Sequence, residues 1–252
     1  MGLLKTIRQM TNRILAPTGF SVVRSHEALR AELPTMETAV SRLPGLGFRF
    51  GAVIDLGAAS GTWTAMAAGI LTDSKFLMVE ALREREPLLR QRAQHTGPRL
   101  QYHICAAGPR HGSTSFLVTE DLDGSGAVTR EGARAGQMRE VEMLTLDELV
   151  SSHQLPGPYL VKFDTHGFEL PILEGAAETL KRTDIIVMEC YLIEGTERQL
   201  LFWQMCERMQ QLGFRCFDIV DQLYRPRDGR LWQIDLFFAR CDWPGFKDLG
   251  YA

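Results

Sequence analysis

Short apolar runs alternate with amphipathic or charged segments along most of the chain. A short apolar run that ends at a turn predicts a buried strand, and a longer amphipathic stretch predicts a helix. The strands predicted in this way cover residues 53–56, 76–80, 100–106, 159–164 and 184–190. The predicted helices cover residues 62–71, 84–94, 168–181 and 197–212. This alternation predicts an α/β fold with a doubly wound, mostly parallel sheet and helices on both faces.

Two segments depart from this alternation. Residues 107–145 contain two short extended stretches around a segment rich in glycine and serine, Asp123-Gly124-Ser125-Gly126. This pattern predicts an inserted hairpin with a mobile loop, in which Ser125 and Gly126 form either a lid over a cleft or a plain loop. Residues 216–220 and 233–239 predict an antiparallel hairpin, whose turn contains Arg227-Asp228-Gly229-Arg230.

The first part of the chain predicts a separate element. Residues 1–50 are expected to form an N-terminal helical extension, and residues 51–252 the main domain. Within the extension, residues 3–15 form an amphipathic pattern with basic side chains. Such a helix either lies on a membrane surface or docks on the protein's own core or on a second subunit. Peripheral membrane contact and a homodimer contact both stay open.

The composition limits which kinds of molecule the protein is expected to bind. The 252 residues carry a formal net charge of -3, so the chain lacks the basic surplus expected for nucleic-acid binding. Five scattered cysteines without a C-x-x-C pair indicate reduced thiols and a cytoplasmic location. No apolar run approaches the roughly 20 residues that span a bilayer, so no transmembrane segment is predicted.

A glycine-containing loop follows the first predicted strand and reads Asp55-Leu56-Gly57-Ala58-Ala59-Ser60-Gly61. Glycine lets the backbone turn sharply near a ligand, and the following helix N-terminus favours an anionic group. The loop ends in Gly61-Thr62-Trp63, which excludes a P-loop, and it lacks the G-x-G-x-x-G spacing of a dinucleotide site. The candidate cofactor-binding residues in this loop are Asp55, Gly57, Ala58 and Gly61.

An acidic residue strengthens the prediction of a nucleoside site. Glu80 ends the second predicted strand, about twenty residues beyond the loop, where a carboxylate can hold both hydroxyls of a ribose. The alternative for Glu80 is a solvated residue at a strand end. Asp55 either orients the loop or contacts the amino group of a bound donor.

Three motifs in the second half of the chain carry a family resemblance. They are Thr145-Leu146-Asp147-Glu148-Leu149, the segment from Leu160 to Leu170, and Ile172-Leu173-Glu174-Gly175-Ala176. In this order they resemble the FkbM family of methyltransferases, which commonly shows T-L-D-x-L, I-K-x-D-V-E-G-x-E and L-x-G-A. The resemblance runs from about residue 53 to 189 and weakens toward 239. In one departure, Thr165-His166 stands where Val-Glu is frequent in the family.

The resemblance implies a fold, a cofactor and a reaction. The fold is a Rossmann-like seven-stranded sheet with a C-terminal antiparallel hairpin. The cofactor is S-adenosyl-L-methionine. The reaction is the O-methylation of a hydroxyl group on a sugar, a glycan or another natural-product acceptor.

Methyl transfer to a hydroxyl needs a base, or a metal ion that acidifies the hydroxyl. Asp164 lies at the carboxyl end of a central predicted strand, and His166 follows in the next loop. These two residues are the candidate catalytic residues. Asp164 is also a candidate contact for the methyl donor. The alternative is that Asp164 or Thr165 only caps the following helix. Asp164 and Glu189 together form a weak candidate for a divalent metal site, because oxygen ligands are common on any surface.

Two other classes of function stay open. An NAD(P)-dependent oxidoreductase shares the strand, the glycine turn and the ribose acid, although it uses a different glycine spacing. A non-catalytic adenosyl-binding module keeps the fold without turnover.

Overall fold

The computed structural model describes Thr11 and residues 34–120, 122, 125–127, 136–193 and 200–250. Contacts divide the chain into two compact units, Met1–Thr35 and Met36–Ala252. Residues 36–50, which the sequence analysis assigned to the extension, therefore group with the second unit through helix α3 (Met36–Arg42). The predicted helix over residues 3–15 lies outside the described residues, apart from Thr11. The description below concerns the second unit.

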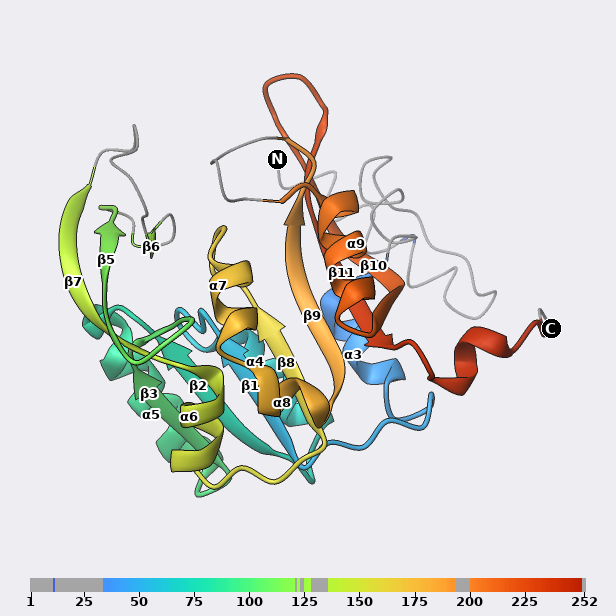
Figure 1. Ribbon diagram of the computed structural model, residues 1–252, viewed down its shortest axis with the longest axis horizontal. Helices are drawn as coiled ribbons and strands as arrows, with labels where there is room; N and C mark the ends of the chain where they lie inside the picture. The colour runs from blue at the N-terminus through green and yellow to red at the C-terminus, as the bar shows by residue number, and fades with distance from the viewer. Residues whose placement is uncertain are drawn as a thin grey trace. The chain divides into compact units, whose positions relative to one another are not determined.

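Seven strands form the main sheet of this unit, in the order β10-β11-β9-β8-β1-β2-β3 (Figure 1). Six of them run in the same direction, and the seventh, β11, pairs antiparallel with both β9 and β10. The strands are β1 (Ala52–Leu56), β2 (Lys75–Glu80), β3 (Leu100–Ile104), β8 (Tyr159–Phe163), β9 (Thr183–Tyr191), β10 (Phe214–Tyr224) and β11 (Leu231–Arg240). The mostly parallel seven-stranded sheet and its C-terminal antiparallel hairpin are thereby confirmed.

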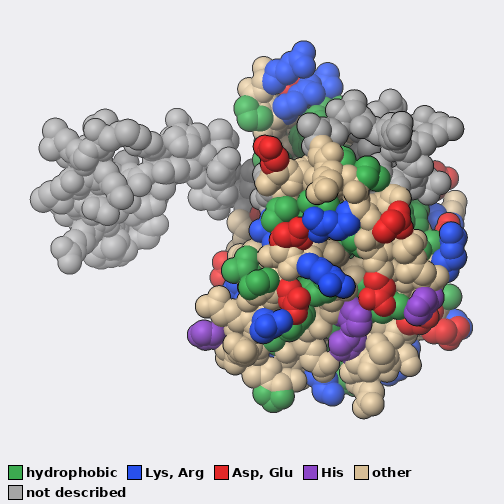
Figure 2. All heavy atoms as spheres, turned by 90° about the vertical axis from the view of Figure 1, so that its left-hand side faces the viewer, with side chains coloured by type: hydrophobic (Ala, Val, Ile, Leu, Met, Phe, Trp, Pro, Cys, Tyr) green, Lys and Arg blue, Asp and Glu red, His purple; other side chains and the backbone are tan. Residues whose placement is uncertain are grey.

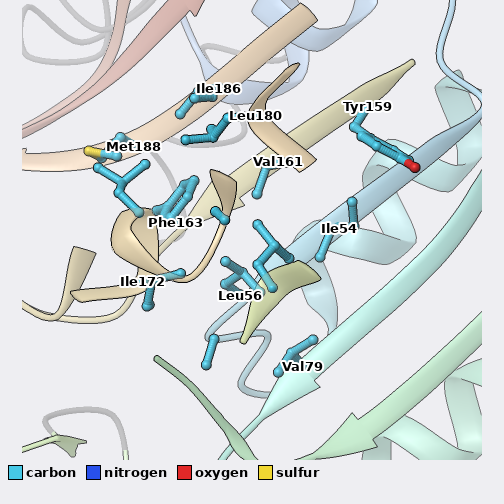
Figure 3. Close-up of a cluster of buried hydrophobic side chains, with 14 of the residues drawn as sticks. Ile54, Leu56, Val79, Tyr159, Val161, Phe163, Ile172, Leu180, Ile186 and Met188 are labelled. Carbon is cyan, nitrogen blue, oxygen red and sulfur yellow. The ribbon is translucent and has the colours of Figure 1, made fainter. Parts of the chain in front are cut away.

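Helices cover both faces of the sheet, and the alternation of side chains along each strand explains why. Ile54 on β1 and Val161 on β8 pack in the cluster that Figure 3 shows, together with Ile172 and Leu180 from helices. The neighbouring Val53 belongs to a second cluster on the opposite face. The helices are α4 (Thr62–Ile70), α5 (Glu86–Thr96), α6 (Leu146–Ser152), α7 (Glu169–Glu174), α8 (Ala177–Lys181) and α9 (Phe202–Gln211), with short 3-10 turns at Arg83–Arg85 and Pro244–Lys247.

The insert forms a second sheet in the order β4-β7-β5-β6. Its central pair is the antiparallel pair expected from the sequence, β5 (Gly112–Val118) and β7 (Gln137–Leu144). The short strand β4 (Ala106–Ala107) pairs with β7, so the predicted strand over residues 100–106 is divided between two sheets. The short strand β6 (Gly126–Ala127) pairs with β5.

Two predicted helices differ from the structure. The single helix expected over residues 168–181 is broken into α7 and α8 at Gly175-Ala176, where a side chain on Gly175 would approach the backbone oxygen of Gly108 to 2.2 Å. The helix expected over residues 197–212 starts at Phe202, and residues 194–199 lie outside the described part of the chain.

Two further observations bear on the environment of the protein. Within the described residues, no helix is both long and apolar enough to cross a membrane. Basic and acidic side chains are mixed over the face shown in Figure 2, and all five cysteines are free thiols.

The first family motif, residues 145–149, stabilises the helical layer rather than the edge of the sheet. The Thr145 hydroxyl accepts a hydrogen bond from the Glu148 backbone N–H and caps α6. The Asp147 carboxylate accepts hydrogen bonds from the backbone N–H groups of Glu178 (3.0 Å) and Thr179 (2.7 Å) and caps α8. Both caps satisfy helix N–H groups that have no partner inside the helix.

We therefore expect Asp147→Ala to destabilise the fold, because it leaves the first turn of α8 without acceptors. The expected loss is about 1–2 kcal/mol in the free energy of unfolding, the range for helix caps, measured by urea denaturation. The control is Asp73→Ala, at an exposed turn residue without a hydrogen bond or ion pair to the described residues, which should change stability by less than about 0.5 kcal/mol. Equal effects of the two substitutions would contradict the assignment.

Candidate functional site

The glycine loop brings the end of β1 against the end of β8. Gly57 has φ +77°, and a Cβ there would lie 1.9 Å from the backbone oxygen of Asp164. Gly61 has φ +69°, and a Cβ there would lie 2.8 Å from the sulfur of Met78. Both positions need glycine because of the left-handed φ and the lack of space. The Gly57 and Ala58 N–H groups donate to the Val79 carbonyl, so the loop is also held to β2.

Glu80 lies at the end of β2 and is fixed by the same loop. One carboxylate oxygen accepts a hydrogen bond from the Ala59 N–H (2.8 Å), and the other accepts one from the Leu82 N–H (2.9 Å). Burial raises the pKa of this carboxyl group, and the two backbone hydrogen bonds oppose that shift. Each oxygen has lone pairs left for further donors. Glu80 is thus a preorganised acceptor that can receive hydroxyl groups.

Asp55 lies beneath the loop rather than in the wall of a cavity. Its carboxylate accepts a hydrogen bond from the Thr64 hydroxyl (2.6 Å) and lies 3.5 Å from the Lys162 ammonium. Burial raises the pKa of Asp55, and the Lys162 charge opposes the shift. These contacts hold Asp55 between α4 and β8.

A cavity of about 280 Å³ opens at the carboxyl edge of the sheet. Gly57, Glu80 and Asp164 line it, whereas Asp55, Ala58 and Gly61 of the predicted cofactor set do not. Another part of its wall is apolar and comes from β4, β5 and α7. The residues of that part include Ala106, Ala107, Phe116 and Ile172.

The insert contributes to the cavity as well. Ser125, Gly126 and Ala127 are among the lining residues, so this part of the predicted loop lies beside the cleft. The Ser125 hydroxyl accepts a hydrogen bond from the Thr119 N–H (3.0 Å), which ties this segment to the end of β5. The position is that of a cover over the cavity.

Lys162 is a site residue that the sequence analysis missed. It is buried in β8 and donates a hydrogen bond to Asp164 (2.7 Å), while Asp55 lies on its other side. Burial lowers the pKa of this ammonium, but the two carboxylates outweigh burial and raise it, so Lys162 stays charged. Lys162 in turn lowers the pKa of Asp164 against the effect of burial. A lysine inside an otherwise apolar strand was the available signal.

His166, Glu189 and Asp164 come together at the other end of the cavity. The His166 Nδ1 atom lies 3.5 Å from Glu189, 3.3 Å from the Tyr191 hydroxyl and 4.0 Å from Asp164. His166 has φ +55°, an uncommon conformation for a residue with a side chain. Glu189 also accepts hydrogen bonds from Tyr191 and from the Gln233 side chain (2.7 Å). The sequence alone did not indicate that Tyr191 and Gln233 contact Glu189.

The protonation states within this cluster depend on one another. The contact with Glu189 raises the pKa of His166 to about 9, although burial opposes the shift. Burial raises the pKa of Glu189 to about 7, with His166 opposing and Asp164 adding to the shift.

The capping alternative for Asp164 and Thr165 does not hold. The N-cap of α7 is Phe168, with no side-chain cap, and the Thr165 hydroxyl donates to Glu169 instead. The metal alternative keeps a geometric basis, because donor atoms of Asp164, His166 and Glu189 all lie within 4.8 Å of one another. These two carboxylates and one imidazole could hold a divalent ion, although Lys162, Tyr191 and Gln233 already contact the carboxylates.

A family model described as "Methyltransferase FkbM domain" matches residues 55–216, from the glycine loop to β10. The chain belongs to the FkbM methyltransferase family. The match includes the loop, Glu80 and the Asp164–Glu189 region of this FkbM methyltransferase, which confirms the resemblance seen in the sequence. A search of curated proteins finds no match.

Solved structures of several methyltransferases align with this chain at low identity. An rRNA methylase from Streptococcus thermophilus is 13% identical, with 80% of this chain and 93% of that chain covered and a TM-score of 0.46. A 1,6-didemethyltoxoflavin-N1-methyltransferase from Burkholderia thailandensis is 16% identical, with 82% and 78% covered and a TM-score of 0.43. A precorrin-6y C5,15-methyltransferase from Geobacter metallireducens is 11% identical, with 83% and 95% covered and a TM-score of 0.43. The family match, not these likenesses, identifies the chain.

We expect the His166 imidazole to titrate near pH 9 and Glu189→Gln to lower that midpoint toward or below about 6.5, the ordinary value for histidine. The reason is that the substitution removes the carboxylate that favours the charged imidazole, while burial remains. Because the folded pKa is raised, the pair contributes its full stability below about pH 6.5 and loses it as the pH rises through about 9. Histidine NMR titration measures both effects.

His153 is an internal control in the same titration. Its pKa is lowered by burial and by His103, so it should titrate below His166 and be unaffected by Glu189→Gln. A His166 midpoint that the substitution leaves unchanged would show that Glu189 does not hold the imidazole.

Proposed function

We propose that this FkbM methyltransferase transfers a methyl group from S-adenosyl-L-methionine to the hydroxyl oxygen of a sugar, glycan or natural-product acceptor. The observation that carries the proposal is a single cavity whose lining includes both Gly57 and Glu80 and the cluster of Asp164, His166 and Glu189. The first pair suits a nucleoside, and the second suits the reacting groups. Five free cysteines fit the reducing cytoplasm, where we place the enzyme.

The donor would lie along the glycine loop. Glu80 receives the ribose hydroxyls, because its carboxylate is held rigidly and faces the cavity. The apolar wall near Ala106 and Phe116 offers a surface for the adenine ring. Because Gly57 has no side chain, the backbone of Asp164 can lie directly against the glycine loop. The donor would pass from the end of β1 to the end of β8 at this point and contact Asp164 there.

When bound, S-adenosylmethionine supplies an electrophilic methyl carbon on a sulfonium. Asp164, whose pKa the neighbouring Lys162 lowers, places negative charge at this end of the cavity, which favours a cationic group there. Asp164 and Glu189 also stabilise positive charge on His166. The charge distribution of this chain's own residues therefore suits the donor before transfer.

His166 is the proposed base. Glu189 holds the ring through Nδ1 and fixes its orientation, which leaves Nε2 for the acceptor. The acceptor O–H proton passes to Nε2, the oxygen forms the new bond to the methyl carbon, and the carbon–sulfur bond breaks with its electron pair left on sulfur. Glu189 stabilises the imidazolium that forms. Holding both partners in one cavity supplies the orientation that an in-line displacement needs.

A divalent ion is a second candidate for activating the hydroxyl, favoured by the close approach of three donor groups. It would replace the base function of His166, because Nδ1 would then bind the ion. An oxidoreductase would bind NAD in place of the methyl donor. A non-catalytic module would bind the donor without turnover. S-adenosylhomocysteine, and not NAD, should raise the melting temperature.

We expect Glu80 to recognise the ribose hydroxyls of the donor product. Wild-type protein should bind S-adenosylhomocysteine about tenfold more tightly than its 2′-deoxyribose analogue, since a lost hydrogen bond to a charged group is equivalent to about 1.5–3 kcal/mol. In Glu80→Ala the two ligands should bind equally. Isothermal titration measures the four constants, and comparing two ligands within one variant removes any general loosening of the loop. A tenfold preference that survives in Glu80→Ala would exclude this role.

We expect His166→Gln to lower kcat by about 10²–10⁴-fold, the usual range for a general base, while S-adenosylhomocysteine affinity changes little. Wild-type kcat/KM should rise with pH through about 9, because only neutral imidazole accepts a proton, and the variant should lose this limb. The measurement is transfer of labelled methyl to the first acceptor that supports turnover. His103→Gln is the control, since His103 contacts His153 and does not line the cavity.

A chelator separates the two ways of activating the hydroxyl. With His166 as base, EDTA should leave the rate unchanged. If EDTA abolishes turnover and Mn²⁺ restores it, the three donor groups hold a metal ion and the base assignment fails.

A further inference from the structure

The β10–β11 hairpin ends in a basic turn that the proposed chemistry does not use. Residues 225–230, here called the arginine turn, contain three arginines and one aspartate and so have a net charge of +2, in a chain whose net charge is -3. Figure 2 shows basic side chains gathered where this part of the molecule projects upward. The turn is therefore a local reversal of the protein's charge.

The arginine turn is an ordered structure rather than a loose collection of charges. The Arg225 guanidinium donates to both carboxylate oxygens of Asp228, one of them at 3.0 Å, and stacks over the Trp232 ring at 5.5 Å. The Gly229 N–H donates to the Arg225 carbonyl (2.9 Å), and the Arg225 N–H donates to the Arg230 carbonyl (2.8 Å). These bonds hold the backbone of the turn in one conformation.

Asp228 compensates only one of the three arginines. It lies 3.8 Å from the Arg230 Nε atom, beyond hydrogen-bond distance, and the Arg230 side chain is 64% exposed. Arg227 is exposed and has no ion pair or hydrogen bond with the described residues. Two guanidinium groups are thus left with unused donors, beside the half-exposed ring of Tyr224.

The sheet places this turn at the reacting edge. Strand β11 runs antiparallel to β9, and Gln233 lies opposite Tyr191, the last residue of β9. Residues that precede Gln233 therefore extend beyond the carboxyl end of β9, as the β10–β11 loop does in Figure 1. Gln233 itself contacts Glu189 of the cluster (2.7 Å). Arg230 is three residues further, which is about 10 Å along an extended strand.

We propose that the arginine turn binds an anionic group (a phosphate, sulfate or carboxylate) carried by the methyl acceptor at some distance from the hydroxyl that reacts. Guanidinium groups bind such groups through paired, charge-assisted hydrogen bonds. The half-exposed ring of Tyr224, which precedes Arg225 in the chain, suits the apolar face of a sugar. The inference rests on the proposed function, because it identifies the acceptor class of the same site, and it assigns Arg227 and Arg230 as specificity residues.

The experiment uses full-length protein saturated with S-adenosylhomocysteine and two matched pairs of probes. The first pair is tetragalacturonate and its uncharged methyl ester, titrated by calorimetry. The second pair is phosphatidylglycerol and phosphatidylcholine vesicles, tested by co-sedimentation, which shows whether the anion belongs to a soluble acceptor or to a lipid headgroup. The variants are Arg227→Ala with Arg230→Ala, and the control Lys75→Ala with Lys181→Ala. Lys75 begins β2 and Lys181 ends α8, just before β9, so the control pair lies away from the carboxyl edge of the sheet and changes the net charge equally.

We expect wild-type protein and the lysine control to bind one anionic probe more tightly than its neutral partner. The arginine double variant should bind that probe about tenfold more weakly, equivalent to about 1.4 kcal/mol. Raising the salt from about 0.1 to about 1 M should weaken the wild-type complex, since the Debye length falls from about 10 to about 3 Å. Equal binding of charged and neutral probes, or equal losses in the two double variants, would overturn the proposal. S-adenosylhomocysteine affinity, measured on the same samples, separates this failure from failure of the proposed function.

Discussion

The buried ammonium group of Lys162 is the interaction on which the geometry of the site depends. Lys162 and Asp55 are register partners on adjacent parallel strands, and Asp164 is two residues further along the chain. Asp55 and Lys162 are both buried, and a charge removed from water must be paired, so these two side chains can be buried only together; the partly exposed Asp164 is a second partner of the ammonium. The ammonium also lies over the Trp63 ring at the start of α4. These contacts therefore fix the distance between the glycine loop, which follows β1, and Asp164, which follows β8.

The periodicity of the sequence was sufficient to predict the layers, and the order of strand, glycine loop and acidic residue was sufficient to place Gly57 and Glu80 at one edge of the sheet. Val53 and Ile54 face opposite helical layers, as expected for a strand buried on both faces. Gly57 and Glu80 line the cavity as expected, since strand ends of a parallel sheet share one edge. Asp164 and His166 are also brought together as expected.

Contacts between residues distant in sequence were beyond this kind of reasoning. Gln233 reaches Glu189 only because β11 inserts beside β9, and Tyr191 reaches His166 only because of the φ at His166. The break between α7 and α8 depends on the close approach of Gly175 to Gly108, which no local propensity encodes. Lys162 could have been suspected as a charged residue in an apolar strand, but its partners could not.

The motifs that carry the family resemblance have two different physical roles. Thr145, Asp147 and Gly175 cap and space helices and do not line the cavity, whereas Asp164 does. The departure at His166 changes the electrostatics. A glutamate there would add a third carboxylate beside Asp164 and Glu189, while the histidine supplies the opposite charge. This chain therefore has an imidazole, and not a third carboxylate, beside Asp164 and Glu189.

The strand order has a consequence for synthesis of the protein. A nascent chain exposes β9 and β10 before β11 leaves the ribosome, yet β10 pairs with the sheet only through β11. The hydrogen-bonding edge of β9 stays open during that interval, and open edges recruit strands from other chains. When β11 inserts between β9 and β10, it closes the sheet and also brings Gln233 into contact with Glu189. A ribosome-bound intermediate therefore has an open sheet edge and lacks the Gln233 contact to Glu189 at the same time.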